Sequence, residues 1–235
     1  MMKIKEVAKS AIEVFLPRHC PVCGQALDRD EEYLCRQCLL HIPRTHFEGI
    51  PFNAMEQHFA GKIPIERAAA YFFYERRDPY ASILHDIKYH NMPQMGRWIS
   101  RLAARQMAPS GLWQGVDYLI PVPLHATKQA KRGYNQSDYL AQGVSDYTGI
   151  PIYEAIAARK PHATQTHKSA HERYLNAQGL YAPIAEARQE LQGKHVMIVD
   201  DVATTGATLL TCAESIASIP GIKISLFTLA AARLQ

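Results

Sequence analysis

The stretch VMIVDDVATTGAT, residues 196–208, decides the fold. It begins with four apolar residues, Val196–Val199, which is typical of a parallel strand buried on both faces of a sheet. Two adjacent aspartates, Asp200 and Asp201, come next, and a loop of small residues then leads into the helical pattern of residues 207–218. In open α/β sheets, ligands bind beyond the carboxyl ends of the strands. We therefore expect the two aspartates to lie at a ligand-binding site.

The loop after the aspartates favours a ligand that carries a phosphate. Small residues before a helix N-terminus leave backbone N–H groups free, and the positive end of the helix dipole favours an anion. The two carboxylates can accept hydrogen bonds from neighbouring hydroxyls, so the combination indicates a ribose 5-phosphate. The alternative is one aspartate that caps the helix beside a solvated turn, which leaves the second aspartate unexplained. The candidate ligand-binding residues of this stretch are Asp200, Asp201, Ala203, Thr204, Thr205, Gly206, Ala207 and Thr208.

This stretch resembles the phosphoribosyl pyrophosphate (PRPP) signature of type I phosphoribosyltransferases. The rival phosphate-binding patterns GxxxxGK[ST] and GxGxxG are absent from the sequence. Purine-salvage members of that group carry an aspartate at the position of Thr204, whose hydroxyl has no titratable proton near neutral pH. A transferase with this sequence would therefore resemble the orotate-type members, which have threonine there.

From Ala68 onward, the sequence alternates apolar strand patterns with helical patterns. This alternation predicts right-handed crossovers and a mostly parallel sheet flanked by helices. Together with the resemblance, it makes the expected fold class α/β and type I phosphoribosyltransferase-like. The predicted strands cover residues 68–74, 116–123, 195–201 and 224–232. The predicted helices cover residues 81–89, 95–107, 135–147 and 207–218.

Four cysteines form two CxxC pairs near the beginning of the sequence, Cys20, Cys23, Cys35 and Cys38. Each pair offers two thiolates from one turn, and two pairs complete the tetrahedral four-sulfur site of structural zinc. Because thiolates fill all four positions, such a zinc has no open position for a substrate. The alternatives are a rubredoxin-like iron site and two disulfides, which a cytosolic enzyme rarely keeps. The fifth cysteine, Cys212, is expected to be a buried core thiol.

The composition is that of an ordinary globular protein. Of the 235 residues, 47% are hydrophobic and 20% are charged, which is enough for a sizeable core. The formal net charge of +4 fits phosphate-bearing ligands or nucleic acid and requires neither. Apolar residues between Ile4 and Phe15 recur at helical spacing and are interrupted by charges, which predicts an amphipathic helix rather than a targeting peptide. No apolar run is long enough to cross a bilayer, so we expect a soluble, cytoplasmic protein without membrane insertion.

These patterns divide the sequence into three parts. We expect the amphipathic helix and a four-cysteine zinc-binding segment over residues 1–45 and a connection over residues 46–66. The phosphoribosyltransferase-like domain is expected to cover residues 67–235.

Two basic segments are expected to face the acidic loop. The first, LIPVPLHATKQAKRGYNQ (119–136), carries Lys128, Lys131 and Arg132 ahead of a helix that Asn135 is suited to cap. The second, ARKPHATQTHKSAHERYLN (158–176), is long, polar and without clear periodicity. A segment of this kind inside an α/β domain is typical of a functional lid.

Cations in these segments suit the chemistry of pyrophosphate. Pyrophosphate leaves during phosphoribosyl transfer, and cations with Mg²⁺ would stabilise its charge. The candidate catalytic cations are Arg159, Lys160 and Arg173, and Lys128 and Arg132 are further candidates for ligand binding. The alternatives are a solvated basic loop and a contact with a nucleic-acid backbone.

The whole layout is similar to that of the competence protein ComF family and its GntX-type relatives, a phosphoribosyltransferase-like group. The resemblance covers nearly the full chain and rests on the segments CPVCG…CRQC, DIKYHN (86–91), PVPL…KRGYNQ and IVDDVATTGAT. A looser match in the second basic segment involves Thr164, Gln165, Arg173 and Asn176.

The resemblance implies a PRPP-binding domain fronted by a zinc-binding segment, with Mg²⁺ entering together with the phosphates. It also implies a place in natural transformation, where such proteins are thought to work with a DNA-uptake helicase and other proteins that handle single strands. No phosphoribosyl acceptor is established for the group.

Three functions stay open at this point. The chain is a transferase that acts on PRPP, a binding protein that serves DNA uptake, or a regulator that senses PRPP. The acidic pair favours ligand binding in all three cases, and carboxylates repel phosphodiesters. Any contact with single-stranded DNA is therefore expected on residues 128–132, on residues 159–173 or on the zinc-binding segment.

Overall fold

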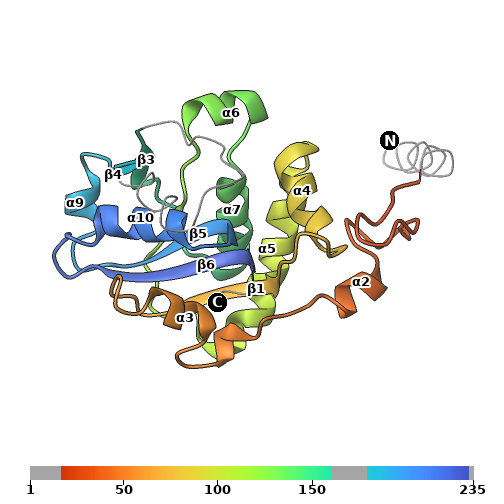
Figure 1. Cartoon of the computed structure of the whole chain (residues 1–235), viewed down its shortest axis with the longest axis horizontal. Helices are drawn as coiled ribbons and strands as arrows, with labels where there is room; N and C mark the ends of the chain where they lie inside the picture. The colour runs from red at the N-terminus through yellow and green to blue at the C-terminus, as the bar shows by residue number, and fades with distance from the viewer. Residues whose placement is uncertain (1–16, 160–178, 233–235) are drawn as a thin grey trace, which may run out of the picture.

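The computed structural model describes residues 17–159 and 179–232, and its centre is a sheet of parallel strands (Figure 1). The strands lie in the order β1-β6-β5-β2, and each neighbouring pair is parallel. The predicted fold class, a mostly parallel sheet flanked by helices, is therefore confirmed. The strands of this sheet are β1 (Ala68–Phe73), β2 (Tyr118–Pro121), β5 (His195–Ala203) and β6 (Lys223–Ala231).

Strand β5 is buried on both faces, as its apolar run predicts. Val196–Val199 are fully inaccessible to solvent between the neighbouring strands β6 and β2. The strand extends two residues beyond its predicted end at Asp201, because Val202 and Ala203 still pair with the end of β6. Both aspartates therefore lie within the last part of the strand, where the surrounding structure buries them.

Helices cover both faces of the sheet, α5 and α7 on one face and α10 on the other (Figure 1). All four predicted helices are present, with ends within two residues of the expected ones. They are α4 (Ala81–Tyr89), α5 (Pro93–Met107), α7 (Gln136–Thr148) and α10 (Ala207–Ile216). Asn135 caps α7 as predicted, because its side-chain oxygen accepts a hydrogen bond from the Ser137 N–H at 3.3 Å.

Shorter elements, which we did not predict, complete the fold. The helical ones are α2 (Arg36–Leu40), η1 (Phe47–Gly49), α3 (Ala54–Phe59), η2 (Ala108–Ser110), α6 (Ala126–Arg132) and α9 (Ala187–Glu190). Strands β3 (Ile156–Ala158) and β4 (Tyr181–Pro183) form a separate antiparallel pair that packs on α10. Helices this short are marginal alone, so tertiary packing stabilises them, as where α3 contacts β1. Among the described residues, no helix has the length and apolar character needed to span a bilayer.

Helices α5 and α7 approach each other most closely at Gly143. A Cβ atom at this position would lie 2.1 Å from both the Arg97 carbonyl oxygen and the Ser100 Oγ atom. We expect Gly143→Ala to lower the free energy of unfolding by about 1–3 kcal/mol, because the extra methyl group forces the helices apart. Urea unfolding measures the effect, with Gly49→Ala as control, since nothing lies within 4 Å of a Cβ atom at Gly49. Equal stability of Gly143→Ala and the wild type would contradict this packing.

Candidate functional site

The candidate site lies where β5 ends, between helices α4 and α6 and strand β4. A cavity of about 290 Å³ opens there, and we call it the β5 cleft. Of the residues predicted to bind a ligand, six line it: Asp200, Asp201, Thr204, Thr208, Lys128 and Arg132. The structure adds four polar or aromatic side chains that the sequence analysis missed: Lys88, Tyr89, Gln136 and Tyr181.

Asp200 is buried and is held by donors from its surroundings. Its Oδ1 atom accepts hydrogen bonds from the Ser137 hydroxyl at 3.1 Å and from the Asp201 N–H at 2.9 Å. Burial and the neighbouring Asp201 carboxylate raise the pKa of Asp200 to about 7. Keeping two carboxylates together in a buried place costs free energy, and a ligand that donates hydrogen bonds to them would offset part of that cost.

Asp201 is paired on one oxygen and unpaired on the other. Its Oδ1 atom lies 2.9 Å from Nζ of Lys88, a residue in the last turn of α4. Although burial acts in the opposite direction, this carboxylate raises the pKa of Lys88 overall. The Oδ2 atom is buried and has no hydrogen-bond partner among the described residues. A buried acceptor without a donor is costly, so this oxygen is available for a ligand hydroxyl or a cation.

The Lys88–Asp201 pair gives a direct prediction. We expect Lys88→Met to lower the free energy of unfolding at pH 8 by about 2 kcal/mol, because Asp201 loses a charged donor in a buried place. The same substitution made in an Asp201→Asn background should cost less, and the difference is the coupling energy of the pair. Urea unfolding of the four proteins measures it. If the stability loss in the double variant equals the sum of the losses in the two single variants, Lys88 and Asp201 do not form a stabilising ion pair.

Helix α6 brings further positive charge to the cleft. Burial, and then the neighbouring charges of Arg132 and Lys88, lower the pKa of Lys128. Arg132 donates a hydrogen bond to the side chain of Gln136, and its guanidinium lies 5.6 Å from the centre of the Tyr89 ring. Within the described part of the chain, neither Lys128 nor Arg132 forms an ion pair with a carboxylate. The crowded cations would be stabilised by a bound anion such as a phosphate.

The loop between β5 and α10 has a conformation that requires glycine at position 206. Gly206 has a φ of 67°, and a Cβ atom there would lie 2.8 Å from the Phe59 ring. On the same helix, α3, the His58 Nε2 atom lies 3.0 Å from the Thr205 carbonyl oxygen. Helix α3 therefore holds the loop in place, with Thr204 and α10 directed to the cleft side.

The remaining candidates lie away from the cleft or outside the described residues. Ala203 ends β5, and its carbonyl oxygen accepts a hydrogen bond from the Ala232 N–H at 2.8 Å. Thr205, Gly206 and Ala207 belong to the loop and to the start of α10 and do not line the cavity. The Arg159 N–H donates to the Leu180 carbonyl oxygen at 2.7 Å, and its side chain does not line the cleft either. Lys160, Thr164, Gln165, Arg173 and Asn176 lie outside the described residues.

The sequence contained two features that bear on Lys88 but do not identify it as a site residue. Lys88 belongs to the DIKYHN segment, which carried part of the family resemblance. The buried residues of its helix, Ile83, Leu84 and Ile87, also show that α4 packs against the domain. Neither feature shows that Lys88 forms an ion pair with Asp201, which only the folded structure reveals.

The four cysteines of the N-terminal segment that is predicted to bind zinc, which we call the zinc-binding segment, converge on one point. Their sulfur atoms all lie within 4.8 Å of one another, and the Sγ atoms of Cys23 and Cys35 are 3.7 Å apart. Zn–S bonds of about 2.3 Å in a tetrahedron require about 3.8 Å between sulfur atoms, so the cluster fits a four-thiolate metal site. The Cys38 N–H points at Cys35 Sγ at 3.4 Å, a donor that stabilises a thiolate. All described cysteines, including the buried Cys212, are free thiols.

Comparison with known proteins places this geometry in context. The family model described as the phosphoribosyl transferase domain matches residues 121–233. The DNA utilization protein YhgH of Shigella flexneri is 32% identical over 201 residues, which cover 83% of this chain and 82% of that protein. Competence protein F of Haemophilus influenzae is 34% identical over 136 residues, 56% of this chain and 59% of that one. Competence protein ComFC of Bacillus subtilis is 29% identical over 91 residues, 39% of this chain and 34% of that one.

A solved structure is also similar, described as the allosteric regulatory enzyme of purine biosynthesis. The match covers 57% of this chain and 25% of that chain, at 20% sequence identity and a TM-score of 0.34. This chain therefore spans a quarter of that enzyme's length, and so weak a likeness supports no argument about the site.

Proposed function

Because this chain belongs to the ComF-like family of proteins with a phosphoribosyltransferase fold, we propose that its β5 cleft binds PRPP or a related ribose 5-phosphate. One observation carries the proposal: two buried carboxylates line the same cavity as Lys128 and Arg132, which form no ion pair with a described carboxylate. PRPP carries a diol between two phosphate-bearing ends. Its 2′ and 3′ hydroxyls would donate to Asp200 and Asp201.

The phosphates have separate binding groups in this proposal. The 5-phosphate would lie against residues 204–208, because Thr204 just before α10 and Thr208 in its first turn both line the cleft. The pyrophosphate would lie against Lys128 and Arg132 on α6. Arg159, Lys160 and Arg173 remain proposed contributors from the second basic segment.

The oxygen donors of the cleft also fit Mg²⁺. Mg²⁺ prefers oxygen ligands and usually enters a site with phosphates. The Oδ2 atom of Asp201 is a buried carboxylate oxygen with no hydrogen-bond partner among the residues that the structure describes. When bound, Mg²⁺ would neutralise charge on the pyrophosphate. This chain's own contribution is to orient the ribose through the two carboxylates and to favour departure of the pyrophosphate with fixed cations.

The wider role that we propose is in natural competence and DNA uptake, as the names of the relatives suggest. On this proposal the protein acts in the cytoplasm, where reducing conditions keep its thiols free to bind zinc. It would be a phosphoribosyltransferase with an acceptor still to be found. The alternative is a protein that binds PRPP without turnover and handles single-stranded DNA, alone or with a DNA-uptake helicase, or senses PRPP.

Calorimetric titration of the zinc-loaded protein tests the proposal. We expect PRPP with Mg²⁺ to bind, and ribose 5-phosphate and pyrophosphate to bind more weakly as parts of the same ligand. A single-stranded (dT)20 oligonucleotide should then be titrated into the same sample. Absence of heat with PRPP, together with salt-dependent binding of the oligonucleotide, would reject the ligand and favour a DNA-handling module on this fold.

A further inference from the structure

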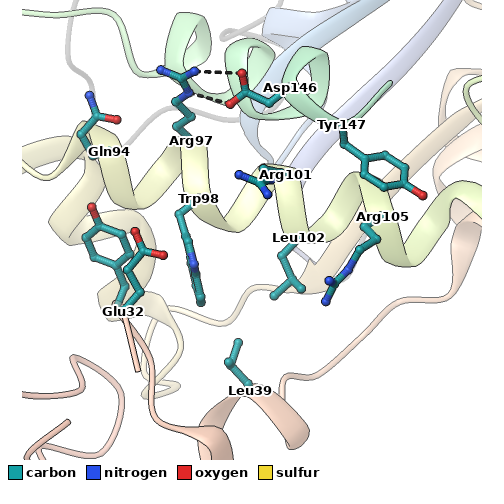
Figure 2. A pocket seen from close by; sticks show the side chains of 11 residues that line it. Glu32, Leu39, Gln94, Arg97, Trp98, Arg101, Leu102, Arg105, Asp146 and Tyr147 are labelled. Atoms are coloured by element: carbon teal, nitrogen blue, oxygen red, sulfur yellow. Dashed lines mark hydrogen bonds and ion pairs between the residues drawn. The ribbon is translucent and has the colours of Figure 1, made fainter. Parts of the chain in front are cut away.

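A second cavity, of about 670 Å³, lies between the zinc-binding segment and helix α5 (Figure 2). We call it the α5 groove, and it shares no lining residue with the β5 cleft. Its floor is one stripe of α5, from Gln94 to Arg105, and the end of α7 and the zinc-binding segment with α2 form its sides. Twelve residues of helix span about 18 Å, so the groove is long enough for a short peptide segment.

The floor of the groove contains two apolar side chains, Trp98 and Leu102, although this stripe of α5 faces away from the sheet. Trp98 and Leu102 are one turn apart on α5, and Leu39 of α2 lies opposite them (Figure 2). The Trp98 ring is supported by Tyr33 of the zinc-binding segment, with ring centres 5.6 Å apart. Tryptophan in a supported position is a frequent anchor of protein interfaces.

The rim of the groove carries three arginines, two of which form no direct ion pair with a described carboxylate. Arg97 is held by Asp146 through two hydrogen bonds of 2.6 and 2.8 Å, which Figure 2 shows as dashed lines. Arg101 and Arg105 are exposed, and neither makes a hydrogen bond or an ion pair with another described residue. They are one helical turn, about 6 Å, apart. Their charges match a ligand with two carboxylates at similar spacing.

We propose that the α5 groove binds an acidic amphipathic segment of a partner protein. Apolar side chains of that segment would lie on Trp98 and Leu102, and its carboxylates would pair with Arg101 and Arg105. This is the arrangement of an amphipathic helix in a hydrophobic groove. It adds an interaction surface to the protein and does not depend on ligand binding in the β5 cleft.

The lining favours a peptide over a nucleic acid. The apolar lining decides between these occupants, because the carboxylates of Glu32 and Asp146 repel phosphodiesters and peptide carboxylates alike. Two leucines line it, and bases stack on aromatic rings or arginine planes rather than on aliphatic side chains. An acidic amphipathic peptide would contact the two leucines and pair with Arg101 and Arg105, which form no ion pair with a described residue.

The experiment is a selection from a phage-displayed library of random 12-residue peptides on the zinc-loaded, full-length protein. Peptides that also bind the variant Arg101→Glu with Arg105→Glu are removed. We expect the remaining peptides to be acidic and to contain leucine, phenylalanine or tryptophan. Fluorescence polarisation should show at least tenfold weaker binding of each peptide to the double variant and to Trp98→Ala. A peptide with its acidic residues changed to lysine should prefer the double variant to the wild type.

The matched control is Arg76→Glu with Arg77→Glu, the same charge change at two exposed arginines outside the groove. Peptide binding to this control should stay within twofold of wild type, and circular dichroism should match for all variants. Three results would overturn the proposal: selected peptides that are neutral or basic, equal losses in the control variant, or no peptide that distinguishes wild type from the groove variant. Loss of (dT)20 binding in the groove variant alone, without discrimination between peptides, would assign the groove to nucleic acid instead.

Discussion

Replacing both cleft aspartates, as Asp200→Asn with Asp201→Asn, is expected to weaken PRPP binding by more than 100-fold. At pH 8, above the pKa of about 7 for Asp200, each amide removes a charged acceptor. A hydrogen bond to a charged group contributes about 1.5–3 kcal/mol. Two such losses give about 3–6 kcal/mol, and each 1.4 kcal/mol is about tenfold in affinity. Calorimetric titration of PRPP with Mg²⁺ into the zinc-loaded variant measures the effect. Unchanged PRPP affinity in the double variant would contradict the assignment of Asp200 and Asp201 to the ligand-binding site.

A control on the ligand side shows which groups the aspartates bind. Wild-type protein should bind ribose 5-phosphate more tightly than 2-deoxyribose 5-phosphate, because the deoxy sugar lacks one hydroxyl donor. The double variant should not distinguish the two sugars. Loss of affinity without loss of this discrimination would mean that the substitutions act through long-range electrostatics.

A pH series shows whether the fold survives the substitution and whether Asp200 is buried as described. Burial raises the pKa of Asp200 to about 7, so the folded state holds this proton more tightly than the unfolded chain, where aspartate has a pKa of about 3.9. The stability from this proton is complete below pH 3.9 and is lost as the pH rises through 7. Asp200→Asn has no such titration, so its thermal midpoint relative to wild type should be higher at pH 8 than at pH 5. An equal difference at both pH values would contradict the raised pKa.

The second large effect is expected from Cys35→Ser. Structural zinc binds zinc-finger peptides with apparent free energies of about 10–16 kcal/mol, and we expect folding of the zinc-binding segment to depend on such binding. We expect the variant to lose its zinc, from one per chain to near none, and the zinc-binding segment to unfold around Leu34, which is fully buried. The Tyr33–Trp98 contact would then be lost, and tryptophan fluorescence should shift to longer wavelength. Metal analysis and fluorescence measure both changes.

The matched control is Cys212→Ser, which removes a thiol buried in α10 and far in sequence from the other four. This variant should keep one zinc per chain. PRPP affinity of Cys35→Ser should stay within a few-fold of wild type, because no described residue of the zinc-binding segment lines the β5 cleft. One zinc retained in Cys35→Ser, or iron in the purified wild type, would contradict the zinc assignment.

Local patterns were sufficient for the framework of this protein. The run Val196–Val199 predicted a strand buried on both faces, because a central parallel strand has no polar face. Asn135 predicted the start of α7, because its side chain caps the free N–H of Ser137. The two CxxC pairs predicted a four-sulfur cluster, because each pair occupies a single turn. In all these cases the interacting groups are close in sequence or belong to one element.

Only the tertiary structure decided which side chains complete the site and which surfaces stay open. The Asp200–Ser137 hydrogen bond joins residues 63 positions apart. Lys88 pairs with Asp201 from α4, and nothing in the sequence of that helix indicates which carboxylate its lysine contacts. Trp98 and Leu102 lie on the outer stripe of α5, and the α5 groove exists because the zinc-binding segment stands beside them. Hydrophobic periodicity records which face of an element is covered, and it carries no information on which distant element covers it. Contacts between elements that are distant in sequence are therefore known only from the folded structure.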